Sequence, residues 1–153
     1  MLRALTTKIR KVLYEITRLN RSPKDMAKSF AVGVVIAVSP YLGLHTYMAV
    51  LVAGWLRLPV YPVVIGAHVT NVVTIPFIYT FTTRVGMWIM GLDAEIDFDW
   101  RHITLTGLFH LGKQLFLPFF LGSHIVALLS YVPAYFLSLG VFTLYRRFSK
   151  NGE

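Results

Sequence analysis

The sequence contains no cysteine, so it forms no disulfide bond and offers no thiolate as a metal ligand or nucleophile. Charge is also missing over long distances, because no Asp, Glu, Lys or Arg occurs from Ser29 to Leu56, from Leu58 to Thr83 or from Gln114 to Tyr145. A helix of about 20 apolar residues crosses the hydrocarbon core of a bilayer, where a buried ion costs at least ~2.5 kcal/mol. These three uncharged ranges therefore predict a helical membrane protein.

Acidic residues are scarce as well, and 7 of them against 15 basic residues give a net charge of +8. Eight of the basic residues precede the first uncharged range: Arg3, Lys8, Arg10, Lys11, Arg18, Arg21, Lys24 and Lys28. This placement is the positive-inside signal of a membrane protein, so we expect a cytoplasmic N-terminus and no nucleic-acid partner. With 153 residues, 56% of them hydrophobic, the chain has little room for a second, soluble domain.

The first 22 residues predict a basic amphipathic helix, because apolar side chains recur every three or four residues with Lys and Arg between them. Two roles remain open for it: docking on anionic lipid headgroups, or packing on the cytoplasmic face of the helix bundle. The segment Ser22 to Asp25 supplies a capping serine, a first-turn proline and an acid that start the next helix. The predicted domains are an N-terminal helix at 1–22, one transmembrane domain at 23–147 and a short cytoplasmic tail at 148–153.

Two of the uncharged ranges contain helix-breaking residues near their middle. In the first, Pro40 removes a backbone hydrogen bond and Gly43 permits a turn, so neither half crosses a bilayer alone. This range is either one kinked span or a re-entrant helical hairpin, because irregular backbone at membrane depth is tolerated only inside protein or beside water. Thr70 to Pro76 interrupts the second range in a similar way. The pattern predicts an all-α polytopic membrane protein with broken or re-entrant helices.

The third uncharged range contains Pro118 and Pro133 and is too long for one straight span. It is separated from the second range by the segment Asp93 to Asp99, which alternates acids with mostly apolar residues. An EF-hand calcium loop would need glycine where Phe98 stands and glutamate where Thr104 stands. We therefore interpret the segment as a solvated acidic loop.

The basic residues favour one topology in a bacterial inner membrane. If Ser29 to Leu56 is re-entrant, Arg57 stays on the cytoplasmic side and the second range crosses outward. The acidic loop is then external, and the third range returns Arg146 and Arg147 to the cytoplasm. We expect a multi-pass protein with both termini in the cytoplasm.

Three segments together resemble a bacterial membrane family, the domain-of-unknown-function family numbered two thousand and sixty-two. They are Ser39 to Thr46 (SPYLGLHT), Thr70 to Gly86 (TNVVTIPFIYTFTTRVG) and Leu121 to Ser123 (LGS). In this chain Val72 stands where the family usually has a proline after the asparagine. The resemblance spans about residue 24 to 147 and implies an integral inner-membrane protein. It also implies relatives that are fused to glycosyltransferase domains using polyprenyl-linked substrates.

Polar residues at the two breaks predict a binding site, because polar groups in lipid should face one another or a wet cavity. A helix that restarts after Gly43 presents free N–H groups, which suit an anion. The predicted substrate-binding residues, for an anionic headgroup or a phosphate, are Pro40, Gly43, His45, Thr46, Asn71, Thr74, Pro76 and Arg84. Hydrogen bonding between helices is the alternative role for the polar residues, and snorkelling to the interface is the alternative for Arg84.

We expect neither an enzyme nor a cofactor. The uncharged ranges hold no carboxylate to orient a histidine, and no histidines lie at the close spacing of a metal site. Pro40 to His45 is similar to Pro118 to His124, either as an internal repeat or by chance.

The favoured function is a small transporter or binder of an anionic or lipid-linked substrate. The alternative is a non-catalytic accessory or scaffold protein that recruits a partner enzyme such as a glycosyltransferase. The expected partners are membrane lipids, whose anionic headgroups would meet the N-terminal helix. A homo-oligomer or a partner membrane protein remains open.

Overall fold

The computed structural model describes residues 21–41, 43–71, 73–92 and 105–150, and in the last range it describes side chains for 112–148. All regular elements in these ranges are helices: α2 (Pro23–Val38), α3 (His45–Trp55), α4 (Val60–Ala67), α5 (Ile75–Ile89) and α6 (Leu105–Lys150). The all-α prediction is confirmed for this part of the chain. Nearly all of the predicted amphipathic helix, the whole acidic loop and the end of the C-terminal tail lie outside the described residues.

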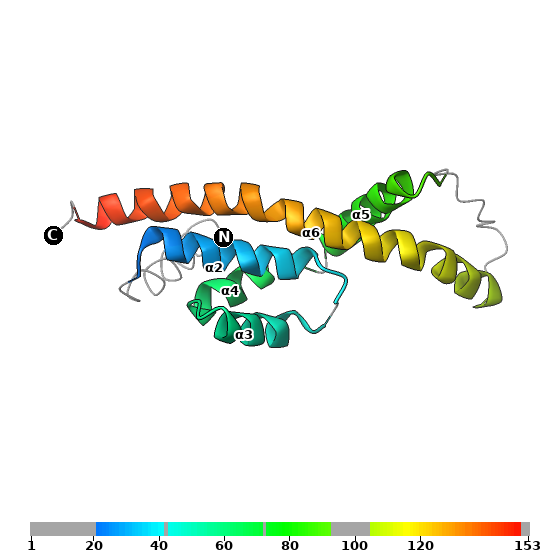
Figure 1. Ribbon diagram of the computed structural model, residues 1–153, viewed down its shortest axis with the longest axis horizontal. Helices are drawn as coiled ribbons and strands as arrows, with labels where there is room; N and C mark the ends of the chain where they lie inside the picture. Colours follow the sequence, from blue (N-terminus) through cyan, green and yellow to red (C-terminus); the bar gives the residue numbers. More distant parts are fainter. Residues whose placement is uncertain (1–20, 42, 72, 93–104, 151–153) are drawn as a thin grey trace.

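The long helix α6 organises the molecule (Figure 1). Helix α2 runs antiparallel to α6 along its C-terminal half, and α5 packs against its N-terminal half. Helices α3 and α4 form an antiparallel pair on the side of α2 that faces away from α6 (Figure 1). The chain therefore reverses direction between α2 and α3, and again between α3 and α4.

The ends of α2 follow from its sequence. The Ser22 hydroxyl oxygen accepts a hydrogen bond from the Asp25 backbone N–H at 3.1 Å, and Pro23 occupies the first helical turn, so the predicted helix start is confirmed. At the other end, Ser39 has an extended backbone, as a residue before proline prefers. Helix α2 thus ends where Pro40 begins the first break.

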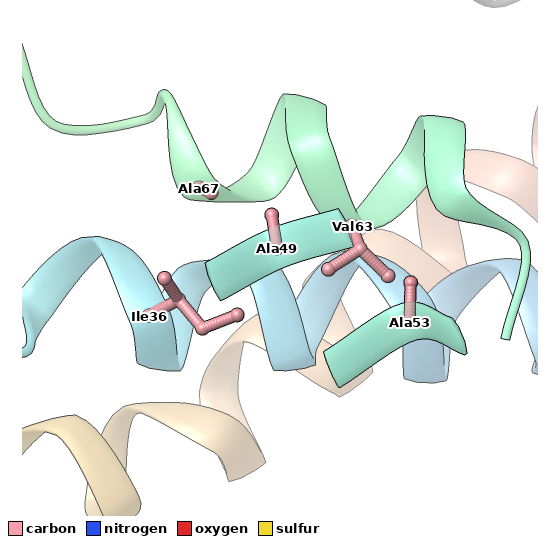
Figure 2. Close-up of a cluster of buried hydrophobic side chains, with 5 residues drawn as sticks. All are labelled: Ile36, Ala49, Ala53, Val63 and Ala67. Atoms are coloured by element: carbon pink, nitrogen blue, oxygen red, sulfur yellow. The ribbon is translucent and has the colours of Figure 1, made fainter. Parts of the chain in front are cut away.

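Helices α2 and α4 cross at two glycines. A Cβ atom on Gly33 would collide with the carbonyl oxygen of Val63, and one on Gly66 would collide with the carbonyl oxygen of Phe30. Beside this crossing, a core of small side chains joins three helices: Ile36 of α2, Ala49 and Ala53 of α3, and Val63 and Ala67 of α4 (Figure 2). The small residues let the backbones approach, which is the usual packing device of helices in lipid.

A second close crossing joins α5 to α6, where Gly86 faces the Pro118 backbone and Gly122 faces the Thr82 carbonyl. The Ser123 hydroxyl donates to the Thr82 hydroxyl at 3.1 Å, and both side chains are buried. Farther along α6, Phe142 packs on Met26 and Ala27 of α2. Each half of α6 therefore has its own partner helix.

Helix α6 continues through Pro118 and Pro133 without a break. The two prolines thus differ from Pro40, which follows the end of a helix. Pro118 is buried at the α5 crossing, where packing against a neighbouring helix holds the backbone in place. The similarity of Pro40 to His45 with Pro118 to His124 does not extend to local structure, because the first segment is a turn and the second is helix.

The surface is unusually apolar. Among the described residues, 28 large apolar side chains are exposed, against 13 hydrophobic residues that are buried. Within α6, Gly112–Phe148 is long and apolar enough to cross a membrane, and only 17% of its most apolar stretch is buried. The core helix of a soluble protein would be mostly buried. No other helix in the described ranges meets the same length and composition criteria.

Candidate functional site

The first break, from Ser39 to Leu44, joins α2 to α3. The Ser39 hydroxyl donates to the Ile36 carbonyl at 2.6 Å. Gly43 has a φ of +82°, in the left-handed region that favours glycine, and there the chain turns back toward α3. Pro40 and Gly43 thus have the turn roles that the sequence predicts, and they place His45 and Thr46 in the first turn of α3.

The second break, from His68 to Thr74, joins α4 to α5. The Asn71 side-chain oxygen accepts hydrogen bonds from the backbone N–H groups of Val73 at 2.9 Å and Thr74 at 3.0 Å. The Thr74 hydroxyl oxygen accepts from the Asn71 N–H at 2.9 Å, and Pro76 follows in the first turn of α5. Asn71 and Thr74 therefore stabilise the turn that leads into α5, whose N-cap residue Thr74 makes no side-chain cap hydrogen bond.

Two hydrogen bonds bring the breaks together. Thr46 Oγ1 lies 3.2 Å from His68 Nε2, which links the start of α3 to the end of α4. The Thr70 hydroxyl donates to the Ala37 carbonyl at 3.2 Å, which links the second break to the end of α2. Of the predicted site residues only Thr46 takes part in these two bonds, and Asn71, Thr74 and Pro76 of the second break do not.

A third hydrogen bond ties the first break to the middle of α6. Tyr41 Oη lies 3.1 Å from His124 Nε2, and the two rings meet edge to face. The His124 ring also lies against Phe120, one turn earlier on α6. We use the name polar layer for the residues that make these links between elements: Tyr41, Thr46, His68, Thr70 and His124.

Only Thr46 of the polar layer was among the predicted site residues. Tyr41 was missed because a tyrosine in an apolar range gives no signal of its own. His68 and His124 stand out in the sequence as polar residues at membrane depth, but their partners are distant along the chain. For Tyr41 and His124 the separation is 83 positions.

Neither His45 nor Arg84, two of the other predicted residues, takes part in these links. Arg84 is exposed on α5, eight positions beyond Pro76, which corresponds to roughly 12 Å along a helix. His45 lies beside Thr46, and its Nε2 atom is buried with no hydrogen-bond partner among the described residues. His45 is thus an unsatisfied polar group next to the polar layer, whereas Arg84 is a charge on the outer face of α5.

Comparison with known protein families shows to which family this chain belongs. A model of an uncharacterised family conserved in bacteria, DUF2062, matches residues 6–151. The chain belongs to this family. No curated protein and no solved structure matches the chain.

The segments that carry the DUF2062 resemblance meet in space. Ser39 to Thr46 contacts α6 through Tyr41 and His124, one position beyond the Leu121 to Ser123 segment. Thr70 to Gly86 contacts that segment through Thr82 and Ser123. In this DUF2062 protein, the described residues contain no group of three His, Asp or Glu side chains that could hold a metal ion.

Proposed function

We propose that this DUF2062 protein is a multi-pass inner-membrane protein that binds an anionic or lipid-linked substrate at the polar layer and moves it across the bilayer. The observation that carries the proposal is the pair of hydrogen bonds, Thr46 to His68 and Tyr41 to His124. They join two helix breaks to each other and to α6 within uncharged ranges of the chain. Interrupted helices at membrane depth are a common way to build a transport site.

The apolar surface supports a membrane setting. Trp55, Trp88 and Phe77 are 83%, 81% and 74% exposed, and each would be costly to leave in water. The polar groups of the two breaks are instead turned toward one another. That distribution fits lipid around the molecule, since lipid accepts exposed apolar side chains and penalises unpaired polar ones.

The arrangement of the helices supports the preferred topology. The start of α2, the turn between α3 and α4 and the end of α6 lie toward the same end of the molecule (Figure 1). Each of these segments is basic, through Lys24 and Lys28, Arg57, and Arg146 and Arg147 respectively. By the positive-inside rule this end is cytoplasmic.

The helix lengths support a re-entrant hairpin for α2 and α3. With 16 and 11 residues, these helices rise roughly 24 and 16 Å, both less than the ~30 Å hydrocarbon core. The hairpin would enter from the cytoplasm and return there. Helices α4 and α5 together would then cross outward, and α6 would cross back.

The available donors favour an anion over a cation. The three uncharged ranges hold no carboxylate that would attract a cation, whereas their hydroxyl, imidazole and amide groups carry N–H and O–H donors that can bind an anion. The side chains of Tyr41, Thr46 and His68 are exposed. A ligand with an apolar tail could therefore reach them from the lipid, which supports a lipid-linked substrate.

The test uses the full-length protein in phosphatidylcholine liposomes that carry a fluorescent polyprenyl phosphate. We expect the protein to speed its movement between leaflets, and the double variant Tyr41→Phe, Thr46→Val to slow it at least tenfold. Thr80→Val is the matched control, because the Thr80 hydroxyl bonds only its own helix, at the Pro76 carbonyl. No binding or movement of polyprenyl phosphate, of other anionic lipids or of soluble anions would refute the proposal.

Deleting residues 1–20 separates this function from a scaffold role. A transporter retains its polar layer and its lipid movement without these residues. A scaffold that recruits an enzyme through the N-terminal helix loses its partner instead. Loss of a partner enzyme with no lipid movement in the intact protein would favour the scaffold.

A further inference from the structure

We infer that the polar layer takes up a proton when it binds its anion, and that the proton goes to Nε2 of His68 or His124. This inference rests on the proposed function and adds the source of the positive charge. The uncharged ranges contain no lysine or arginine whose charge could balance an anion. An unbalanced anion in a low-dielectric setting is strongly disfavoured.

Both histidines have the same hydrogen-bond pattern, and this pattern sets their tautomer. Nδ1 of His68 lies 2.8 Å from the carbonyl oxygen of Val64, and Nδ1 of His124 lies 2.7 Å from that of Phe120. A carbonyl oxygen only accepts, so Nδ1 carries the hydrogen in each ring. In the neutral imidazole, Nε2 is therefore the acceptor, and the hydroxyls of Thr46 and Tyr41 donate to it.

An added proton can go only to Nε2, because Nδ1 is already protonated. Nε2–H then becomes a donor, and the hydroxyl oxygens of Thr46 and Tyr41 become the acceptors. The O–H group of each hydroxyl then no longer donates to the histidine, and it can donate to another acceptor. One protonation therefore supplies a positive charge and a hydroxyl donor at the same place, which is what an incoming anion requires.

The nearest fixed positive charges on the described helices lie outside the uncharged ranges, and on α6 Lys113 precedes His124 by eleven positions, roughly 16 Å along the helix. Helix α2 has no ionisable side chain after Lys28, and α3 contributes His45 and Tyr47. Helix α4 contributes Tyr61, α5 contributes Tyr79 before Arg84, and α6 contributes Tyr131 beyond His124. Imidazole is the side chain among these whose charge ordinarily changes between about pH 5 and 8.

The test measures anion binding and proton uptake together, on the full-length protein in phosphatidylcholine nanodiscs. Two probes distinguish a free oxyanion from a headgroup: inorganic sulfate, and short-chain phosphatidylglycerol. Neither probe titrates in this pH range, so any proton taken up goes to the protein. Calorimetry in two buffers of different ionisation enthalpy counts the protons.

We expect at least one probe to bind with uptake of about one proton, and to bind at least about tenfold more tightly at pH 6 than at pH 8. The double variant His68→Gln, His124→Gln should bind weakly at both pH values without proton uptake. Tyr41→Phe with Thr46→Val should weaken binding but keep the proton uptake. Thr80→Val should match the wild type.

Nitrogen-15 spectra of the wild-type histidines give a second readout that does not depend on variants folding. At pH 8 they should show the hydrogen on Nδ1, and the anion should shift Nε2 toward the protonated form. Binding without proton uptake, or uptake that persists in the histidine double variant, would overturn this inference and leave the proposed function standing. Failure of both probes to bind at either pH would also overturn this inference, whereas the proposed function is decided separately by the polyprenyl phosphate assay.

Discussion

Gly33 of α2 and Gly66 of α4 face each other where these two helices come closest. A Cβ atom on Gly33 would approach the Cα of Gly66 to 2.8 Å, and one on Gly66 would approach the Cα of Gly33 to 3.0 Å. The crossing positions α4, and therefore His68 at its end, against α2. Its tight packing makes the contact between α2 and α4 sensitive to added volume.

Replacing Gly33 with alanine should destabilise the protein by about 1 to 3 kcal/mol, because the new methyl group collides with rigid backbone rather than with a movable side chain. Reversible unfolding in mixed micelles, followed by circular dichroism, measures the change. Gly140→Ala is the control, since a Cβ at Gly140 of α6 meets open space. That variant should be neutral or stabilised by up to about 1 kcal/mol. Equal effects of the two substitutions would contradict the crossing.

Asn71→Ala should lower the free energy of unfolding by about 0.5 to 2 kcal/mol, because the N–H groups of Val73 and Thr74 lose their acceptor. Asn71→Ser keeps an acceptor oxygen without adding a charge and should retain most of the stability. The same unfolding measurement applies to both variants. If serine were as destabilising as alanine, the side-chain hydrogen bonds of Asn71 would not be the reason for the loss.

Thr82 and Ser123 should show an energetic coupling across the α5 and α6 interface. Their buried hydroxyls are hydrogen-bonded, and such contacts between membrane helices average about 0.6 kcal/mol. A double-mutant cycle with Thr82→Val and Ser123→Ala measures it, with each single variant and the pair unfolded under identical conditions. A coupling of zero would mean that the two hydroxyls pack together without contributing a specific bond.

The local features of this fold could be read from the sequence, because they depend on neighbouring residues. Ser22, Pro23 and Asp25 start α2, and Pro40 ends it, through backbone rules that operate within one turn. The break at Thr70 to Pro76 forms although Val72 stands in place of the family's proline, because the Asn71 side chain bonds the turn that leads into α5.

The relationships between distant segments could not be read in the same way. Pro118 gives the same sequence signal as Pro40, but α6 continues through it because α5 packs against it. The partner of His124 could not be identified from the sequence, because its contact with Tyr41 depends on where the first break lies against α6. The uncharged ranges predicted that polar groups would meet, and the fold determines which of them form hydrogen bonds with one another.

Arg57 has a backbone conformation that is usually adopted by glycine. Helix α3 ends with hydrogen bonds from the Leu58 N–H to the Ala53 carbonyl and from the Arg57 N–H to the Gly54 carbonyl. This is a Schellman motif with Arg57 at φ +54°, and Gly91 has the same role at the end of α5. An L-residue in this region costs roughly 1 to 2 kcal/mol, so a reason other than stability is needed for arginine here.

The proposed topology supplies that reason, because in it Arg57 would hold the turn between α3 and α4 on the cytoplasmic side. Arg57→Gly should therefore raise the free energy of unfolding by about 1 kcal/mol while weakening the orientation of the hairpin. Labelling a cysteine introduced at Leu58 measures the orientation, since the natural chain has none. Arg57→Lys keeps the charge and the strain, so it should match the wild type in both measurements. Labelling of Leu58→Cys from the outside in a protein with Arg57 intact would contradict the topology.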